Sequence, residues 1–354
     1  MAVNIAELER RARRLLTPEV YDYYAGGSGS ERTLRASTHA WRQHWLMPRV
    51  LRDVSTVDTS VRLPGLPETV AQTPLAVAPT GFHGLASPEG ELATARGAAA
   101  AGALMVVSSR SSRRLEDIGQ VTADGGGGWW FQVYVMRDRD LTARLVSRAV
   151  AAGARALVLT ADTPVVGRKR RDRGDDVITE AEFTVNTGPL ADLGQAEQAD
   201  DLTFAAIGWL ARLGGVPVLV KGVLRADDAR ACLAAGAAAV IVSNHGGRQL
   251  DRAVPTALAL PAVAAELGPS AQVLADGGLR TGEDVLTALG LGARAVFLGR
   301  PVLWALACGG ADGVRDLLTG MTSDLAHAMA LAGARTIGGI AGVTGPAAAH
   351  SLDT

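Results

Sequence analysis

The chain has 354 residues, 48% of them hydrophobic, and a formal net charge of −1. That length allows one large domain with a sizeable core, and the near-neutral charge gives no reason to expect a nucleic acid or an anionic membrane as a partner. The two cysteines, Cys232 and Cys308, are too few and too far apart for a disulfide framework or a zinc cluster, and no metal site is expected. The N-terminus lacks the apolar run of a secretory signal, and no uncharged apolar run reaches about 18 residues, so we expect a cytoplasmic protein without a membrane span.

Residues 1–50 are rich in arginine and aromatic side chains and lack a strand-like run, so we expect a helical extension that covers one end of the following barrel. Eight short apolar runs come next, each bounded by glycine, proline or polar residues. Their apolar residues are continuous rather than alternating, as in buried parallel strands. The predicted strands are Pro74–Gly81, Ala103–Ser109, Trp129–Val135, Ala156–Asp162, Pro217–Val223, Ala239–His245, Gln272–Gly278 and Ala295–Pro301.

Helical patterns separate most of these strands, and the repeated alternation predicts a single α/β domain over residues 1–354, a (β/α)8 TIM barrel. A doubly wound open sheet is the alternative, but no GxGxxG motif opens a helix after the first strand. Residues 163–201 are the longest stretch without periodicity, and a loop of this length is typical of an active-site lid. The predicted helices are Glu89–Ala101, Asp138–Ala152, Leu202–Leu213, Ala226–Ala235, Thr256–Leu267 and Thr281–Leu289.

Polar residues gather at the carboxyl ends of the predicted strands, where enzymes with this fold carry their catalytic groups. Polarity that was merely scattered over a surface would not place such a group at nearly every strand end. We therefore expect an active site at this end of the barrel. The strand-end residues are Thr80, Ser108, Gln132, Tyr134, Thr160, Asp162, Lys221, Ser243, His245, Asp276 and Arg300.

Two segments that follow the last two strands predict a phosphate site. Residues 276–280 read Asp-Gly-Gly-Leu-Arg, and residues 298–301 read Leu-Gly-Arg-Pro. Glycines let backbone N–H groups approach a phosphate, arginines supply forked donors, and phosphates commonly bind at this place in the fold. The phosphate could belong to a cofactor or to a phosphorylated substrate.

Two further strand residues carry charge or protons. Lys221 is one of only two lysines, and in its apolar strand it needs a partner, either a carboxylate or the negative charge of a reduced cofactor. His245 ends the sixth strand, and Arg248 follows three residues later. Histidine carries protons near neutral pH, so we expect His245 to be a catalytic base whose ring Asp162 orients.

Several ordered motifs resemble those of the FMN-dependent 2-hydroxy-acid oxidoreductases, which include glycolate oxidase, lactate oxidase, mandelate dehydrogenase and hydroxymandelate oxidase. The resemblance runs from about residue 21 to residue 331, and SNHGGRQLD at 243–251 is its most specific part. The supporting motifs are YDYYAGG at 21–27, APTG at 78–81, FQVYV at 131–135, LTADTP at 159–164, LVKGV at 219–223, DGGLR at 276–280 and LGRP at 298–301.

The resemblance implies FMN as cofactor and a role for each matching residue. His245 is the implied base with Asp162 as its partner, and Tyr134 is directed at the substrate 2-hydroxyl. Tyr23 and Arg248 are implied to hold the substrate carboxylate. The implied FMN contacts are Thr80, Gly81, Ser108, Gln132, Thr160, Lys221 and Ser243 near the flavin, and Asp276, Gly278, Arg280, Gly299 and Arg300 near the ribityl chain and phosphate.

The implied reaction oxidises an (S)-2-hydroxy acid to a 2-oxo acid and passes the electrons to oxygen, a quinone or a dye. The context APTGFHGLASPEG favours a mandelate-like or other bulky substrate. Whether His245 takes its proton from C2 or from the hydroxyl stays open. The alternatives are another FMN-barrel chemistry, such as type 2 isopentenyl diphosphate isomerase, and a non-catalytic flavin-binding protein. The family analogy also implies a homotetramer.

Three residues depart from the usual pattern of the family. Lys169 replaces a second active-site arginine, and lysine is not equivalent as a bidentate donor. Arg110 occupies a pocket position that is often aromatic or small. These two residues predict either recognition of a second polar or anionic group on the substrate or a loop held closed against a carboxylate, unless they are simply solvent-exposed charges. Gly81 stands where many oxidases have alanine, which predicts slow reoxidation by oxygen unless the glycine serves packing.

Overall fold

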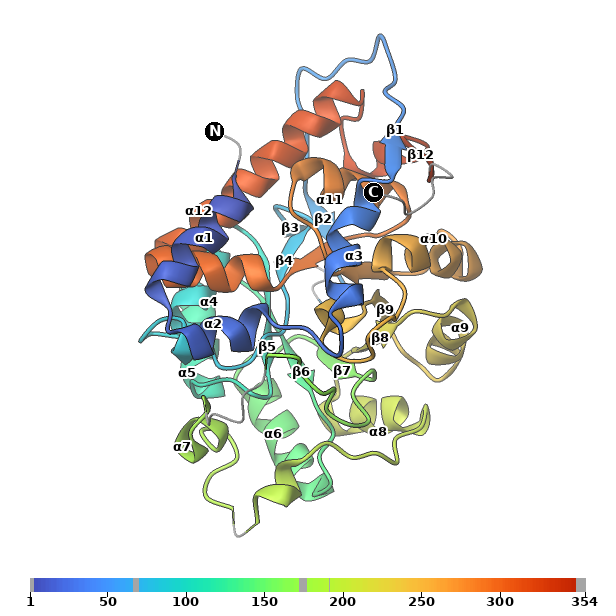
Figure 1. The fold of residues 1–354 in the computed structure, drawn as a ribbon. Helices are drawn as coiled ribbons and strands as arrows, with labels where there is room; N and C mark the ends of the chain where they lie inside the picture. Colours follow the sequence, from blue (N-terminus) through green and yellow to red (C-terminus); the bar gives the residue numbers. More distant parts are fainter. Residues whose placement is uncertain (1–2, 66–69, 172–176, 191, 348–354) are drawn as a thin grey trace.

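The computed structural model describes residues 3–65, 70–171, 177–190 and 192–347. Eight parallel strands close into a barrel in the order β10-β11-β4-β5-β6-β7-β8-β9, which confirms the predicted (β/α)8 fold (Figure 1). Each strand lies within one of the predicted apolar runs. The barrel strands are β4 Leu75–Val77, β5 Leu104–Ser108, β6 Trp129–Val133, β7 Leu157–Thr160, β8 Val218–Val223, β9 Ala239–Val242, β10 Val273–Asp276 and β11 Val296–Leu298.

Helices pack around the outside of the barrel, and all six predicted helices are present (Figure 1). Two long helices were not predicted: α5 Leu115–Asp124 after β5, and α12 Arg300–Leu331, which begins directly after β11 and packs against α1 and α4. The predicted helices are α4 Glu91–Ala100, α6 Arg139–Ala151, α8 Ala205–Gly214, α9 Ala226–Ala234, α10 Thr256–Leu267 and α11 Gly282–Gly290.

The strand side chains form two separate apolar layers. Within β5, Leu104 and Val106 belong to the cluster inside the barrel, whereas Met105 and Val107 belong to the cluster between strands and helices. This alternation follows from the two-residue period of a strand. A short antiparallel pair, β2 Val61–Arg62 with β3 Val70–Ala71, adds Val61 and Ala71 to the inner cluster. The pair therefore extends the apolar core inside the barrel.

The N-terminal segment lies against this carboxyl end. It contains α1 Ile5–Leu15, α2 Pro18–Ala25 and α3 Arg32–Trp41. The Trp41 indole donates a 2.7 Å hydrogen bond to the carbonyl of Gly277, which follows β10. The expectation that residues 1–50 lack a strand is wrong: β1 His44–Leu46 pairs antiparallel with β12 Thr344–Ala347. A strand of three residues has too little pattern to detect, and its partner comes from the far end of the described chain.

Both cysteines carry free thiols. None of the helices in the described residues combines the length and apolar character that a membrane span requires. Within the same residues, no group of three or more His, Cys, Asp or Glu side chains is arranged to hold a metal ion.

Candidate active site

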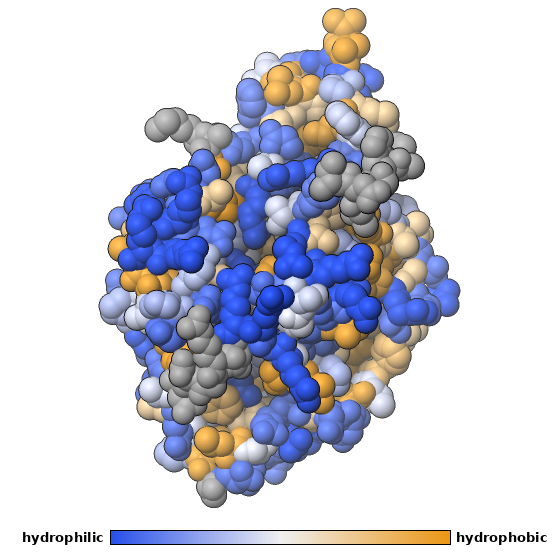
Figure 2. Space-filling model, viewed as in Figure 1, coloured by the Kyte–Doolittle hydropathy of each residue, from blue (hydrophilic) through white to orange (hydrophobic). Residues whose placement is uncertain are grey.

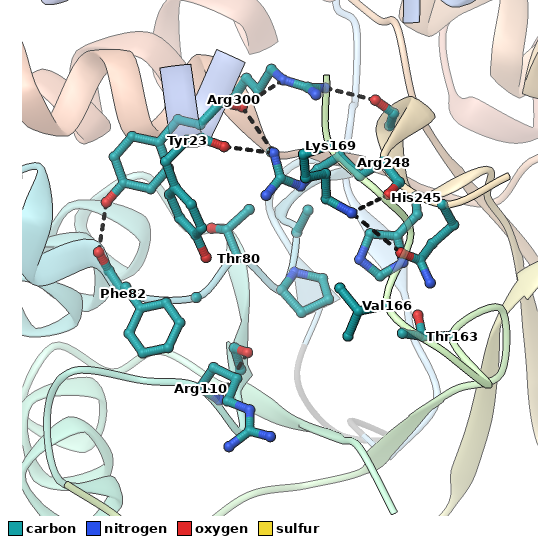
Figure 3. Close-up of a pocket in the computed structure, with 18 of the residues that line it drawn as sticks. Tyr23, Thr80, Phe82, Arg110, Thr163, Val166, Lys169, His245, Arg248 and Arg300 are labelled. Atoms are coloured by element: carbon teal, nitrogen blue, oxygen red, sulfur yellow. Dashed lines mark hydrogen bonds between the residues drawn. The ribbon is translucent and has the colours of Figure 1, made fainter. Parts of the chain in front are cut away.

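A cavity of about 1220 Å³ opens at the carboxyl ends of the barrel strands (Figure 3). The strand ends form its floor, and the loop after β7 and helix α2 contribute its other walls. Ligand pockets usually measure about 300–1,000 Å³. The cavity therefore has room for a nucleotide-sized cofactor together with a small substrate.

His245 lies at the start of a tight turn directly after β9. Its φ is 55°, in the left-handed region, and Gly246 and Gly247 continue the turn with φ of 61° and 72°. The turn aims the imidazole at the end of β7, where Nδ1 lies 2.9 Å from Asp162 Oδ1. The His245 backbone N–H donates to Ser243 Oγ at 3.1 Å. Two strand ends thus fix the ring, and glycines, which adopt positive φ without a steric penalty, follow where the chain must turn again.

The pKa shifts of His245 and Asp162 keep His245 in the neutral form that a general base needs. Burial lowers the pKa of His245 below its usual 6.5, although the Asp162 carboxylate opposes the shift. Burial acts to raise the pKa of Asp162, but His245 and Lys221 outweigh it and hold that pKa below 3.8. At neutral pH the imidazole is therefore uncharged and the carboxylate ionised, so Nδ1 carries its proton towards Asp162 and Nε2 is free to accept one.

Tyr134, just beyond β6, faces the accepting nitrogen. Its hydroxyl lies 3.4 Å from His245 Nε2. Burial raises the pKa of Tyr134 to about 12, so the phenol keeps its proton at neutral pH. The geometry brings together the three residues that the sequence predicted as catalytic: Tyr134, Asp162 and His245.

Arg248 lies across the cavity beside Tyr23 (Figure 3). Its Nη1 donates to the carbonyls of Tyr23 at 2.7 Å and Gly26 at 3.0 Å, and its guanidinium carbon lies 5.3 Å from the centre of the Tyr23 ring. In the described part of the chain, Nε and Nη2 of Arg248 have no hydrogen-bond partner, so the rest of the fork is available to an anion. Burial raises the pKa of Tyr23, so its hydroxyl remains a donor.

The predicted flavin contacts form two hydrogen-bonded chains around the barrel mouth. In the first, Ser108 Oγ donates to Gln132 Oε1 at 3.0 Å, and Gln132 Nε2 donates to Thr160 Oγ1 at 3.0 Å. In the second, Lys221 Nζ donates to Ser243 Oγ at 3.0 Å and lies 3.2 Å from Asp276 Oδ2. Burial disfavours the charge of Lys221, but Asp276 and Asp162 outweigh it and raise the pKa of the ammonium. The mouth therefore carries a fixed positive charge below the cavity.

The phosphate end of the cavity lies at β10 and β11. Arg300 begins α12, and its guanidinium donates to the carbonyls of Tyr24, Gly26 and Gly246 at 2.9 Å each. Burial, helped by the neighbouring charges of Arg248 and Arg280, lowers the pKa of Arg300 to about 9. An anion bound at this point would offset both the burial of the Arg300 charge and its repulsion by the two neighbouring arginines. The N-terminus of α12 also favours an anion through the helix dipole.

Asp276 and two glycines at this end bear on how FMN would fit. Asp276 Oδ1 is buried and has no hydrogen-bond partner among the described residues, which suits a ribityl hydroxyl. Gly278 has φ of 87°, and a Cβ there would lie 2.2 Å from the carbonyl of Ser37, so the close approach of the N-terminal segment requires glycine. At Gly299 a Cβ would make only an ordinary 3.6 Å contact with Thr80, so space alone does not require that glycine.

Lys169 and Arg110, the two departures from the family pattern, have different surroundings. Lys169 Nζ donates to the carbonyls of Gly167, at 2.8 Å, and of Arg248 (Figure 3). It therefore ties the loop after β7 to the turn that carries Arg248. Arg110 instead lies on the opposite side of the cavity from Arg300, with its guanidinium buried.

Several supporting residues escaped prediction. His83 Nε2 lies 2.6 Å from Thr80 Oγ1, and the buried Glu91 carboxylate accepts the His83 N–H at 3.0 Å, so the two fix the turn after β4. Gln249 Nε2 donates to the carbonyls of Asp162 and Val165 at 3.1 Å. Its place directly after Arg248 in SNHGGRQLD was the one available signal.

Comparisons with known proteins agree with this geometry. The profile of the family described as FMN-dependent dehydrogenase matches residues 12–343. The chain is 42% identical to an L-lactate oxidase of Nostoc sp. over 94% of both chains, and 42% identical to a 4-hydroxymandelate oxidase of Amycolatopsis orientalis over 95% of this chain and 96% of that one. A solved structure of mandelate oxidase with benzoyl-formic acid superposes with a TM-score of 0.87 at 42% identity, covering 96% of this chain and 97% of the other.

Three findings agree on the same kind of enzyme. The family profile spans nearly the whole chain, the relatives match along almost their full length, and the cavity suits FMN. They favour a 2-hydroxy-acid enzyme over an isomerase or a non-catalytic flavin protein. The chain belongs to the FMN-dependent dehydrogenase family and is an FMN-dependent 2-hydroxy-acid oxidoreductase.

Proposed function

We propose that the protein oxidises a bulky, mandelate-like (S)-2-hydroxy acid to the 2-oxo acid, with His245 as the base. The observation that carries the proposal is the His245–Asp162 pair, with Nδ1 and Oδ1 2.9 Å apart, facing Tyr134 and Arg248 across one cavity. When bound, FMN supplies the acceptor for the two electrons that leave the substrate.

The protein residues would divide the remaining work. Arg248 and Tyr23 bind the substrate carboxylate, which turns C2 and its hydroxyl towards His245. His245 Nε2 accepts the proton, and the Asp162 carboxylate stabilises the imidazolium that forms. Tyr134, held protonated, donates a hydrogen bond to the substrate oxygen. Lys221 keeps a positive charge at the mouth of the barrel, where negative charge gathers during the oxidation.

A bulky side chain suits the rest of the cavity. Its wall includes Phe82, Val165, Val166 and Phe183, which together offer an apolar surface larger than a methyl group needs. The relatives named for mandelate and hydroxymandelate support an aryl substrate as well.

The test is anaerobic mixing of the FMN-loaded protein with glycolate, (S)-lactate, (S)-mandelate and (S)-4-hydroxymandelate. We expect loss of the yellow flavin absorbance, one equivalent of 2-oxo acid per flavin, and the highest kcat/KM with an aryl acid. A flavin that stays oxidised with every 2-hydroxy acid would contradict the proposed reaction. Highest kcat/KM with glycolate would contradict the bulky substrate alone.

Oxygen is the proposed final electron acceptor, and its reaction is proposed to be slower than that of a quinone or dye. The relatives named as oxidases support oxygen. Gly81, in place of the alanine that many oxidases carry, supports the slow rate. The ratio of turnover with a dye to turnover in air-saturated buffer measures this preference directly.

A cytoplasmic homotetramer is proposed for the assembled protein. Free cysteines support the reducing compartment. Exposed apolar side chains on β1 and the loop after it support an interface: Trp45 is 71% exposed, Val50 80% and Leu51 101%. Figure 2 has hydrophobic residues at the tip of this loop, at the top of the view. Light scattering of the purified protein would give its mass in solution, and the mass of one chain would contradict an assembly.

A further inference from the structure

Arg110 belongs to the predicted site, but the proposed reaction does not use its charge. It follows β5 directly and lines the cavity between the strand ends and the loop after β7. One guanidinium nitrogen, Nη2, donates to the carbonyl of Ala196, and the guanidinium carbon lies 4.1 Å from the centre of the Phe183 ring. Both partners belong to that loop, so Arg110 contacts the loop and the cavity at once.

The other terminal nitrogen, Nη1 of Arg110, is buried and has no hydrogen-bond partner among the described residues. An unpaired donor on a buried cation is costly, and such groups are rare unless a ligand completes them. Burial lowers the pKa of Arg110 to about 10, and the phenols of Tyr134 and Tyr23 oppose that shift. Those two phenols face the substrate region, so the unpaired cation lies near it.

Arg110 also donates to one carbonyl, but the other cations of the cavity leave no buried nitrogen unpaired among the described residues. Lys221 pairs with Asp276, and Lys169 donates to backbone carbonyls. Arg300 is held by three carbonyls and faces the phosphate end. No ion pair joins Arg110 to any carboxylate of the described residues. Of these cations, Arg110 is therefore the one with a buried donor, Nη1, that no described residue accepts.

Gly81 lies directly beside residue 110. A Cβ at Gly81 would lie 3.1 Å from Arg110 Cβ and 3.3 Å from the Arg110 carbonyl oxygen, closer than side chains normally pack. The Arg110 carbonyl also accepts the N–H of Phe82 at 2.9 Å, which holds the ends of β4 and β5 together. A side chain at position 81 would therefore press on the backbone and Cβ of residue 110 and shift the base of the Arg110 side chain.

We propose that Arg110 binds a second carboxylate, on the side chain of the substrate, so that the preferred substrate is a 2-hydroxy acid with a second anionic group. This inference rests on the proposed function and narrows its substrate class. The first carboxylate binds Arg248, the second accepts hydrogen bonds from Nη1 of Arg110, and the ring of Phe183 covers the guanidinium from the loop side. Arg110 is in this sense a specificity-determining residue and takes no part in proton transfer.

The test compares matched (S)-2-hydroxy acids in anaerobic flavin reduction. Each pair has a side-chain carboxylate or its neutral carboxamide: 2-hydroxysuccinate, 2-hydroxyglutarate and 4-carboxymandelate, against their side-chain amides. In the wild-type holoenzyme we expect kcat/KM to favour the charged member of at least one pair by about tenfold or more, the usual effect of a charge-assisted hydrogen bond. Arg110→Leu should lose this preference, and Arg110→Lys should retain part of it.

Arg137 provides the matched control. It also lines the cavity, but its side chain is 56% exposed and pairs with Glu197 at 3.1 Å. Arg137→Leu removes one positive charge from the same wall and should keep the full preference. Equal loss of preference in Arg137→Leu would show that general attraction, not Arg110, selects the dianion, and would overturn the inference.

Three further outcomes separate the inference from the proposed function. If lactate or mandelate reduces the flavin but the wild type treats both members of every pair alike, the second carboxylate site is wrong and the oxidation stands. If Arg110→Leu slows charged and neutral members equally, Arg110 only holds the loop, and the inference is again overturned. If no 2-hydroxy acid reduces the flavin, the proposed function itself fails.

Discussion

The barrel side and the loop side of the cavity are built in different ways. On the barrel side, charged groups pair with groups at other strand ends, as Lys221 does with Ser243 and Asp276. On the loop side, the described residues between 163 and 201 contact the barrel mouth through long-range pairs, such as Arg110 with Ala196 and the Asn186 side chain with residues 111, 113 and 115. The barrel side carries the groups that act on the part common to all 2-hydroxy acids. The loop side carries groups that can distinguish one substrate side chain from another.

This comparison predicts that barrel-side variants slow every substrate, and the largest effect is expected at His245. His245→Ala should leave FMN bound, because the phosphate end does not involve the imidazole. Flavin reduction should fall by at least about 10²-fold, the low end for losing general base catalysis. Stopped-flow reduction with the FMN content measured in parallel provides the check. Reduction at near-normal rate would remove His245 from the mechanism.

A second barrel-side effect concerns pH. The pKa of His245 lies below 6.5, so kcat/KM should stay constant down to that pH and fall only below it, as the base becomes protonated. Asp162→Asn removes the carboxylate that raises the pKa of His245. The acid limb should therefore move to still lower pH, while the maximal rate drops by roughly 10- to 100-fold. An acid limb that moved upward would contradict the assigned pair.

Arg248 contacts both sides of the cavity, because its backbone carbonyl accepts a hydrogen bond from Lys169 of the loop. Arg248→Lys keeps the charge but loses the fork, and Lys cannot hold a carboxylate and the Tyr23 carbonyl in the same plane. We expect kcat/KM to fall about tenfold for every 2-hydroxy acid, with both KM and kcat affected. A loss that appears only with bulky acids would place Arg248 on the selective side instead.

Gly81→Ala tests the boundary between the sides. The added Cβ would press on Arg110, so the variant should weaken the preference for a dicarboxylate. By filling space beside the flavin it should also speed reoxidation by oxygen several-fold, a change of roughly 1 kcal/mol in the barrier. Stopped-flow reoxidation and the matched substrate pairs measure the two effects separately. Equal or slower reoxidation in the alanine variant would refute the role of Gly81 in oxygen reactivity.

The smallest effect is expected at Lys169, which braces the loop. Lys169→Met should change kcat/KM by less than about fivefold for all substrates, since a hydrogen bond to a carbonyl contributes about 1 kcal/mol. A selective loss of dicarboxylate turnover would show that Lys169, and not Arg110, binds the second carboxylate. Lys169→Arg serves as the control, because it restores a forked donor at the same place.

The barrel side was predictable from the sequence because its signals are local. Continuous apolar runs located all eight strands, and the polar residue at each run's end marked the mouth. Arg280 and Arg300 were recognisable because each follows glycines inside a short segment. The contacts beneath the loop were not, since Phe183 and Ala196 are far from Arg110 in the sequence and sit in a stretch without periodicity. The β1–β12 pair and α5 escaped for similar reasons of weak local pattern.

The most direct test of the account compares an acid with the alcohol that lacks its carboxylate. The FMN-loaded protein is mixed anaerobically with (S)-mandelate, with (S)-4-carboxymandelate and with (S)-1-phenylethanol, and the loss of flavin absorbance is followed. We predict rapid bleaching by at least one of the two acids, with 2-oxo acid formed in equal amount, and none by the alcohol. Bleaching by the alcohol at the same rate, or by none of the three, would contradict the claim that Arg248 and His245 together select and oxidise a 2-hydroxy acid.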